Sequence, residues 1–283
     1  MTLDLREQRQ RWRTLRAIRP AGVRVPRIAI VNKKGGSGKT TTTVTLAGIF
    51  ASWGLTARAT DGDPQLASTT YWLAPGVTTG TPMLHDFYFG TKTLDEVTYP
   101  TEVDNLLVVP SLKPLEDVET KRPPGSDGLL AAEFNAGSAH GIDVEIMDAS
   151  PSVGVVTISL LAAATDVMIT MKPSGLDSVG ASEIDEPLAL VKKRLNPALT
   201  IASVVLVDAD GRAEFTGQVQ AQAEQDYPTA IVATVPHSVE AAKAPLAHLP
   251  MHRFAPANPV TDAYYALAEA WLTNAGFELK EAA

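Results

Sequence analysis

Short apolar runs alternate with longer amphipathic segments along most of this chain, and the alternation limits the folds that it can adopt. The runs are rich in Val, Ile, Leu and Ala, as strands buried on both faces are. They occupy residues 28–31, 106–109, 144–147, 167–171, 201–207 and 230–235, with a weaker run at 55–60. Helical patterns lie at about 39–53, 153–164, 179–194, 213–226, 238–248 and 258–275. This order predicts an α/β fold, a mostly parallel twisted sheet with helices on both faces.

The domain organisation follows from length and composition. With 283 residues, 45% of them hydrophobic, the chain has ample material for a core. We expect one domain over residues 27–283 and a basic N-terminal arm over residues 1–26. The Pro- and Gly-rich stretch 121–141 is expected to be a surface excursion.

The charge of the arm differs from that of the body. Residues 1–27 hold eight arginines against Asp4 and Glu7, whereas the remaining residues hold 16 basic and 30 acidic side chains. Residues 3–19 are predicted to form a short basic helix, broken by Pro20. Such a helix either lies loosely on the body or contacts a polyanion, a membrane surface or a partner.

Composition excludes several classes of site. The chain has no cysteine, which rules out disulfides, cysteine-ligated zinc, iron–sulfur clusters and a cysteine nucleophile. Its five histidines have neither metal-ligand spacing nor a nucleophile partner. No apolar run is long enough to cross a membrane, and residues 1–10 lack the apolar core of a signal peptide. We therefore expect a cytoplasmic protein.

A glycine-rich loop follows the first apolar run and precedes a helical pattern. It consists of Lys34, Gly35, Gly36, Ser37, Gly38, Lys39, Thr40 and Thr41. Glycines let backbone N–H groups turn toward phosphate oxygens, and the helix points its positive end at the same place. Lys39 can reach the β- and γ-phosphates of a nucleotide, and Thr40 can place its hydroxyl on Mg²⁺. The arrangement predicts a phosphate-binding loop.

The same loop resembles the deviant Walker A motif, KGGxGK[ST], of the ParA/MinD family of ATPases. Lys33 stands where the general phosphate-loop pattern has its first glycine. The resemblance implies a P-loop NTPase-like fold that uses ATP and Mg²⁺. It also implies that Lys34 reaches the nucleotide of a second subunit, so that hydrolysis is coupled to assembly of a homodimer.

Two acidic segments extend the resemblance. Residues 61–65, DGDPQ, resemble the family's DxDPQ segment, in which the second carboxylate, here Asp63, positions the attacking water and the Mg²⁺ shell. By the same resemblance, Asp61 lies near the nucleotide together with Asp63. The run 144–147 leads to Asp148, as a Walker B strand leads to the carboxylate that orders Mg²⁺. The implied metal residues are therefore Thr40, Asp63 and Asp148.

Further segments match the family in order, so the resemblance covers roughly residues 27–275. They are residues 106–110, 160–173, 235–245 and 263–272. By this resemblance Pro236 lines the adenine. The family also implies an ATP-bound homodimer that binds non-specific DNA such as the nucleoid, and a ParB-like centromere-binding or cargo adaptor that accelerates hydrolysis. The implied role is to partition or position DNA or another large cargo.

Two departures bear on that role. His237 and Glu240 stand where the family has DNA-binding arginines. We therefore hypothesise that the arginines of residues 6–27 supply or supplement the DNA contact. Other basic candidates are Lys192, Lys193, Arg194, Arg212, Lys243 and Arg253. The second departure is the segment 172–175, KPSG, where the family often has an acidic residue.

Two alternative functions remain open. A MinD-like membrane-cycling ATPase needs an apolar and basic C-terminal helix, whereas residues 274–283 are acidic and weakly apolar. No membrane contact is therefore expected, unless the arm binds anionic lipid. A P-loop metabolic ligase would need a second small substrate.

Overall fold

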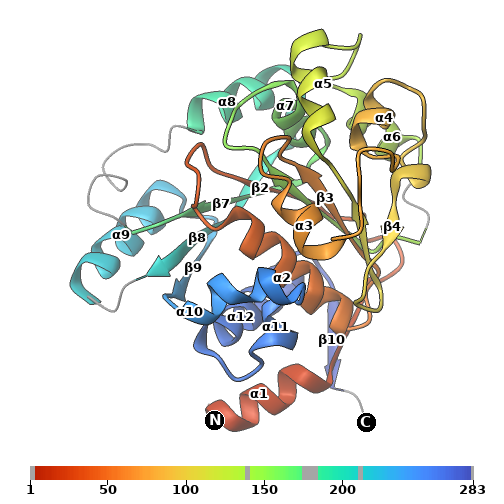
Figure 1. Cartoon of the computed structure of the whole chain (residues 1–283). Coiled ribbons are helices and arrows are strands. Elements are labelled where there is room, and N and C mark those ends of the chain that lie inside the picture. The colour runs from red at the N-terminus through yellow and green to blue at the C-terminus, as the bar shows by residue number, and fades with distance from the viewer. Residues whose placement is uncertain (1–3, 138–140, 174–183, 210–212, 282–283) are drawn as a thin grey trace.

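The predicted parallel sheet is the centre of the computed structural model, which describes residues 4–137, 141–173, 184–209 and 213–281 (Figure 1). In these residues eight strands have the spatial order β4-β5-β3-β6-β2-β7-β8-β9, and only the β4–β5 pair is antiparallel. The strands are β2 (Arg27–Val31), β3 (Ala57–Gly62), β4 (Tyr99–Pro100), β5 (Leu106–Val109), β6 (Val144–Ala149), β7 (Asp166–Met171), β8 (Thr200–Ala209) and β9 (Ile231–Pro236). The α/β prediction is confirmed.

Helices cover both faces of the sheet because alternate strand residues point to opposite sides. Ile28 and Ile30 of β2 face one core, and Ala29 and Val31 face the other. The first core is covered by α2 (Lys39–Ser52), α3 (Ser68–Leu73), α10 (Val239–Lys243), α11 (Met251–Phe254) and α12 (Pro259–Asn274). The second face carries α4 (Leu84–Tyr88), α5 (Glu116–Lys121), α6 (Leu129–Asn135), α7 (Val155–Ala163), α8 (Asp185–Arg194) and α9 (Ala213–Asp226).

The predicted helix over residues 3–19 is wrong in its extent. Helix α1 (Leu5–Thr14) begins at a capping box formed by Asp4 and Glu7. Residues Leu15–Ile18 then form β1, whose side chains alternate between buried and exposed, and β1 pairs antiparallel with β10 (Glu278–Glu281). The N-terminal segment and the C-terminal strand thus lie side by side (Figure 1).

The N-terminal segment packs tightly on α12. The Trp12 ring stacks on Tyr265 with centroids 5.4 Å apart, and its Nε1 donates to Glu269 at 2.8 Å. Trp53 donates from its own Nε1 to the Trp12 carbonyl. Trp12 is 2% exposed and belongs to the first core. The expected boundary at residue 26 stays a prediction about domain organisation.

Two other expectations need correction. The stretch 121–141 includes α6, whose Leu130 and Phe134 are buried in the second core, so it is not wholly a surface excursion. The expected helix over 238–248 is divided into α10 and a 3₁₀ turn at Ala244–Ala247, because Pro245 cannot donate a helical hydrogen bond. Residues 179–183 of the expected helix over 179–194 lie outside the described residues.

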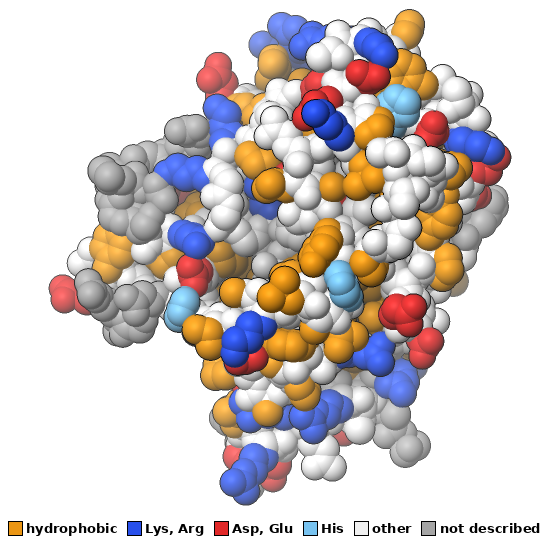
Figure 2. All heavy atoms as spheres, in the orientation of Figure 1, with side chains coloured by type: hydrophobic (Ala, Val, Ile, Leu, Met, Phe, Trp, Pro, Cys, Tyr) orange, Lys and Arg blue, Asp and Glu red, His pale blue; other side chains and the backbone are white. Residues whose placement is uncertain are grey.

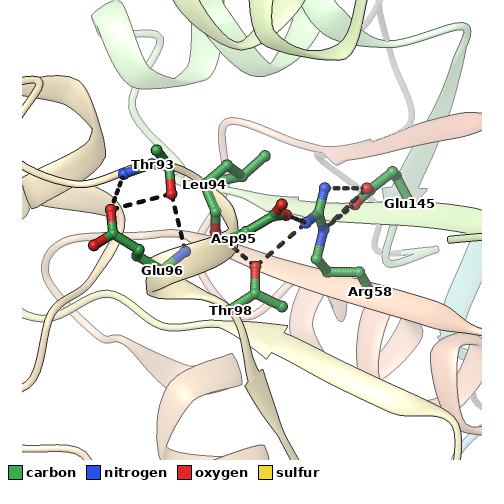
Figure 3. Close-up of polar contacts among 7 residues, drawn as sticks. All are labelled: Arg58, Thr93, Leu94, Asp95, Glu96, Thr98 and Glu145. Carbon is green, nitrogen blue, oxygen red and sulfur yellow. Dashed lines mark hydrogen bonds and ion pairs between the residues drawn. The ribbon is translucent and has the colours of Figure 1, made fainter. Parts of the chain in front are cut away.

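A buried ion pair joins two strands at the amino-terminal end of the sheet (Figure 3). Arg58 of β3 donates from Nε to Glu145 of β6 at 2.9 Å, and both side chains are at most 1% exposed. Its Nη1 lies 3.3 Å from the Thr98 hydroxyl and 3.6 Å from Asp95. Burial raises the pKa of Glu145, although the charge of Arg58 opposes this. The network lies at the opposite end of these strands from Asp61 and Asp148.

Candidate functional site

The predicted site residues meet at the carboxyl ends of three adjacent strands, β3, β6 and β2. Asp61 and Asp148 are direct register partners in the β3–β6 pair, and β2 leads into the loop of residues 32–38. In parallel sheets this edge is where ligands bind. The fold therefore brings the glycine-rich loop and both acidic segments together.

Two glycines of the loop adopt a conformation that other residues rarely adopt. Gly36 has a φ of +70° and Gly38 a φ of +84°. A Cβ on Gly38 would also lie 2.7 Å from Val207 of β8, whereas a Cβ on Gly35 or Gly36 would meet nothing within 4 Å. Space beside the loop is thus open, as an anion held by backbone N–H groups requires.

Asn32 anchors the loop to the sheet, a role that the sequence did not indicate. Its amide nitrogen donates to the Thr170 carbonyl of β7, and its Oδ1 accepts from the backbone N–H of Lys34 at 2.8 Å. The Lys34 side chain is exposed. Residues 33 and 34 are thus positioned relative to β7 through one amide side chain.

Lys39, by contrast, is buried and faces the acidic residues. It is 7% exposed, and its Nζ lies 3.3 Å from the Lys34 carbonyl oxygen. Burial lowers the pKa of Lys39, while the charges of Asp148 and Asp63 partly offset this. The predicted phosphate-binding lysine therefore lies in the field of both predicted metal carboxylates.

Asp148 has the environment of a metal-binding carboxylate. Its Oδ2 accepts from the Thr40 hydroxyl at 2.7 Å and from the Thr69 hydroxyl at 2.8 Å. Its Oδ1 is buried and has no hydrogen-bond partner among the described residues. Burial raises the pKa of Asp148 to about 6.

An unsatisfied carboxylate oxygen beside a threonine hydroxyl fits Mg²⁺, which prefers oxygen ligands and shares them with phosphates. Within the described residues, no group of three or more His, Asp and Glu side chains could hold a metal ion. The protein ligands of this centre would be few. Thr69 was not indicated by the sequence because it comes 79 residues before Asp148.

The two aspartates of the DGDPQ segment fix the local turn. Asp61 is fully buried; its Oδ2 accepts from the N–H and hydroxyl of Thr70, and its Oδ1 from the N–H of Asp63. Burial, and next the charge of Asp148, raise the pKa of Asp61 to about 7. Asp63 accepts the N–H of Gln65 at 3.0 Å. A direct contact of Asp61 or Asp63 with nucleotide or metal stays a prediction.

Pro236 lies beside the glycine-rich loop, and its contact with adenine stays a prediction. It lines a pocket of about 360 Å³ that also contacts Gly36, Gly38 and Thr41 of the loop. Apolar Val239 and Val260 complete its wall. The predicted adenine residue is thus continuous with the phosphate loop.

One residue of each departure from the family pattern, Lys172 and His237, lines this pocket, whereas residues 174 and 175 lie outside the described residues. Asp208 binds Lys172 through Oδ2 at 2.7 Å and His237 through Oδ1 at 2.5 Å. Although burial opposes ionisation, these two hydrogen bonds keep the pKa of Asp208 below its usual value. Lys172 and His237 therefore share one acidic partner, which sequence spacing did not indicate.

Comparison with known proteins agrees with this geometry. A family model described as an AAA domain matches residues 25–201. The chromosome-partitioning ATPase Soj of Thermus thermophilus is 30% identical over 87% of this chain and 95% of its own length.

Solved structures show the same fold. Cobyrinic acid a,c-diamide synthase from Mycobacterium smegmatis, with bound ADP and magnesium, superimposes with a TM-score of 0.75 at 22% identity, over 89% of this chain and 95% of that one. The septum site-determining protein MinD of Pyrococcus horikoshii, complexed with Mg-ADP, gives a TM-score of 0.70 at 22% identity. The match covers 87% of this chain and 96% of that one. With the sequence relationship and the phosphate loop, these findings show that the chain belongs to the ParA/MinD family of P-loop ATPases.

Proposed function

We propose that this protein is an ATP-dependent, dimerising ATPase that partitions or positions DNA or another large cargo. The observation that carries the proposal is the contact between Thr40 and the partly unsatisfied Asp148, directly beside an open glycine loop and the buried Lys39. This is the arrangement that a Mg²⁺-bound nucleoside triphosphate needs.

The residues of the site have distinct roles in this proposal. Backbone N–H groups of residues 35–41 and the Lys39 ammonium hold the phosphates, and Thr40 and Asp148 hold Mg²⁺. When bound, Mg²⁺ neutralises charge on the phosphate oxygens. Asp63 accepts a hydrogen bond from the attacking water and so orients it toward the γ-phosphate.

A second copy of the chain completes the site in trans. Lys34 is exposed at the rim of the loop, so its side chain can approach a nucleotide bound to a partner subunit. A cation delivered only on pairing stabilises the charge that develops on the phosphate oxygens during transfer. Dimerisation and hydrolysis are thereby coupled, and hydrolysis returns the dimer to monomers.

Non-specific DNA and an adaptor protein are the proposed partners. The Soj relative is named as a chromosome-partitioning ATPase, which supports a site of action at the nucleoid. Arg9 and Arg11 of the basic arm pair with Asp262 and Glu269 at 2.6 Å. The DNA contact is therefore assigned to its exposed arginines, Arg6, Arg13, Arg16 and Arg24. A ParB-like protein is the expected activator of hydrolysis.

The membrane-cycling alternative has less support. Residues Glu278–Glu281 form strand β10 on β1 rather than an amphipathic helix. Co-sedimentation with anionic liposomes separates this alternative from DNA binding, and product formation from a second small substrate would identify a ligase.

Phosphate release from Mg·ATP in the presence of DNA tests the proposal. Lys39→Ala removes the buried ammonium, and we expect hydrolysis to fall at least about a hundredfold, as loss of a transition-state charge contact does. Lys92→Ala, which removes an exposed cation paired with Glu96, is the matched control and should keep the wild-type rate. Equal rates for both variants, or no Mg²⁺-dependent release by the wild type, would contradict the proposal.

A further inference from the structure

The segment that follows β5 contacts the loop of Asp61 and Asp63. Ser111 is fully buried, and its hydroxyl donates to the Asp63 carbonyl at 3.2 Å. Its backbone N–H donates to the Thr70 hydroxyl at 2.8 Å, and Thr70 in turn donates to Asp61. Ser111 thus attaches this segment to the Asp63 carbonyl directly and to Asp61 through Thr70 of α3.

The other end of the segment contacts the start of α7, directly after the loop of residues 149–154. Glu119 of α5 accepts the N–H of Val155 through Oε2 at 2.6 Å and the N–H of Val156 through Oε1 at 3.1 Å. These are the first two residues of α7, whose own cap position is Gly154. The first N–H groups of a helix have no partner within it and favour an anion. Glu119 therefore caps α7 from a different element.

The contact with Glu119, and not the backbone conformation, favours glycine at position 154. Its φ of −88° and ψ of −172° are available to any residue. A Cβ there would lie 2.1 Å from Oε2 of Glu119. An alanine at this position would thus have to displace the carboxylate from the two N–H groups that it accepts.

We propose that Glu119 is a positioning residue, which holds the loop of residues 149–154 against the end of β6 and couples it, through residues 111–119, to the loop of Asp61 and Asp63. The segment is fixed between its two contacts because Leu115 and Val118 are fully buried in the second core. A shift of one acidic loop is thereby transmitted to the other. The kinetic part of this inference rests on the proposed ATPase function.

Amide hydrogen exchange tests the contact in the protein without nucleotide. In Glu119→Gln the side-chain NH₂ would face a backbone N–H donor, so one of the two hydrogen bonds is lost. We expect exchange at whichever of Val155 and Val156 loses its acceptor to become about tenfold faster, equivalent to the loss of one hydrogen bond to a charged acceptor. Glu116→Gln, in the same helix, should leave these amides unchanged. Equal protection in both variants would overturn the proposal.

A double-mutant cycle with Gly154→Ala tests how the residue acts. We expect Glu119→Ala and Gly154→Ala each to lower kcat about tenfold with the KM for ATP changed by less than about twofold, and the double variant to be no slower than either single one. Losses that multiply in the double variant would overturn the proposal. If the wild type hydrolyses no ATP, the proposed function fails, and the same cycle measured on urea unfolding still decides whether the two residues act through one contact.

Discussion

The buried side chain of His252 links the stability of the fold to pH. It is 8% exposed, and its Nδ1 is buried without a hydrogen-bond partner in the described part of the chain. It lies edge-on to Tyr265 of α12. Burial, with a smaller contribution from the charge of Arg253, lowers the pKa of His252 to about 4. The folded protein therefore keeps this histidine neutral.

This shift predicts the direction of an acid-induced loss of stability. Below pH 6.5, the ordinary value, the unfolded chain binds a proton that the folded chain does not, so stability is present above pH 6.5 and falls until about pH 4. Urea unfolding measures this. Between pH 7 and pH 4.5 the free energy of unfolding of His252→Leu should fall less than that of the wild type, by on the order of 2 kcal/mol. Parallel pH curves for His252→Leu and the wild type would contradict the assignment.

At the scale of elements, the N-terminal segment has some side chains that attach it to the body and other, basic ones that are exposed. Arg9, Arg11 and Trp12 attach α1 to α12 and β10, whereas Arg6 and Arg13 are exposed. Figure 2 shows basic side chains gathered at the lower end of the molecule, over α1 and its surroundings. Deleting the segment would expose the Trp12 site on Tyr265, so substitution of the exposed arginines is the appropriate test of the DNA contact.

The salt dependence of DNA retention with Mg·ATP measures that contact. For Arg6→Ala/Arg13→Ala we expect weaker retention on any sequence and a log–log salt slope smaller by about 2, one for each lost phosphate contact. Lys92→Ala/Lys121→Ala removes two exposed cations on the α4–α5 side and should leave the slope unchanged. An unchanged slope in the arginine variant would assign DNA binding to another surface.

Elements with strong local patterns could be predicted, and elements formed by distant pairing could not. Strands β2, β5 and β8 are nearly continuous apolar runs, and their order specifies the parallel sheet. Strand β10 has the sequence ELKE, which has no strand-like apolar pattern. It pairs with β1 only because the fold brings these two distant segments together. In the site, the motif spacing indicated Lys39 and Asp148, whereas Glu119 lies 36 residues from the N–H of Val155 that it accepts, and no local pattern marks it.

At the scale of the whole molecule, the proposed function requires that residues 34–41 bind a nucleoside triphosphate and that a second copy of the chain completes the binding site. Asp63→Ala removes the carboxylate assigned to the attacking water but leaves the glycine-rich loop of residues 34–41 unchanged, so ATP-bound dimers should accumulate. Lys34→Ala in the same background should bind nucleotide without pairing, because the cation that reaches across is lost.

Light scattering of Asp63→Ala in Mg·ATP and in Mg·ADP tests this claim most directly. We predict a mass of twice the 30.0 kDa chain in Mg·ATP and one chain mass in Mg·ADP, with Lys34→Ala/Asp63→Ala remaining at one chain mass in both. A single chain mass for Asp63→Ala in Mg·ATP, or pairing that persists without Lys34, would contradict it.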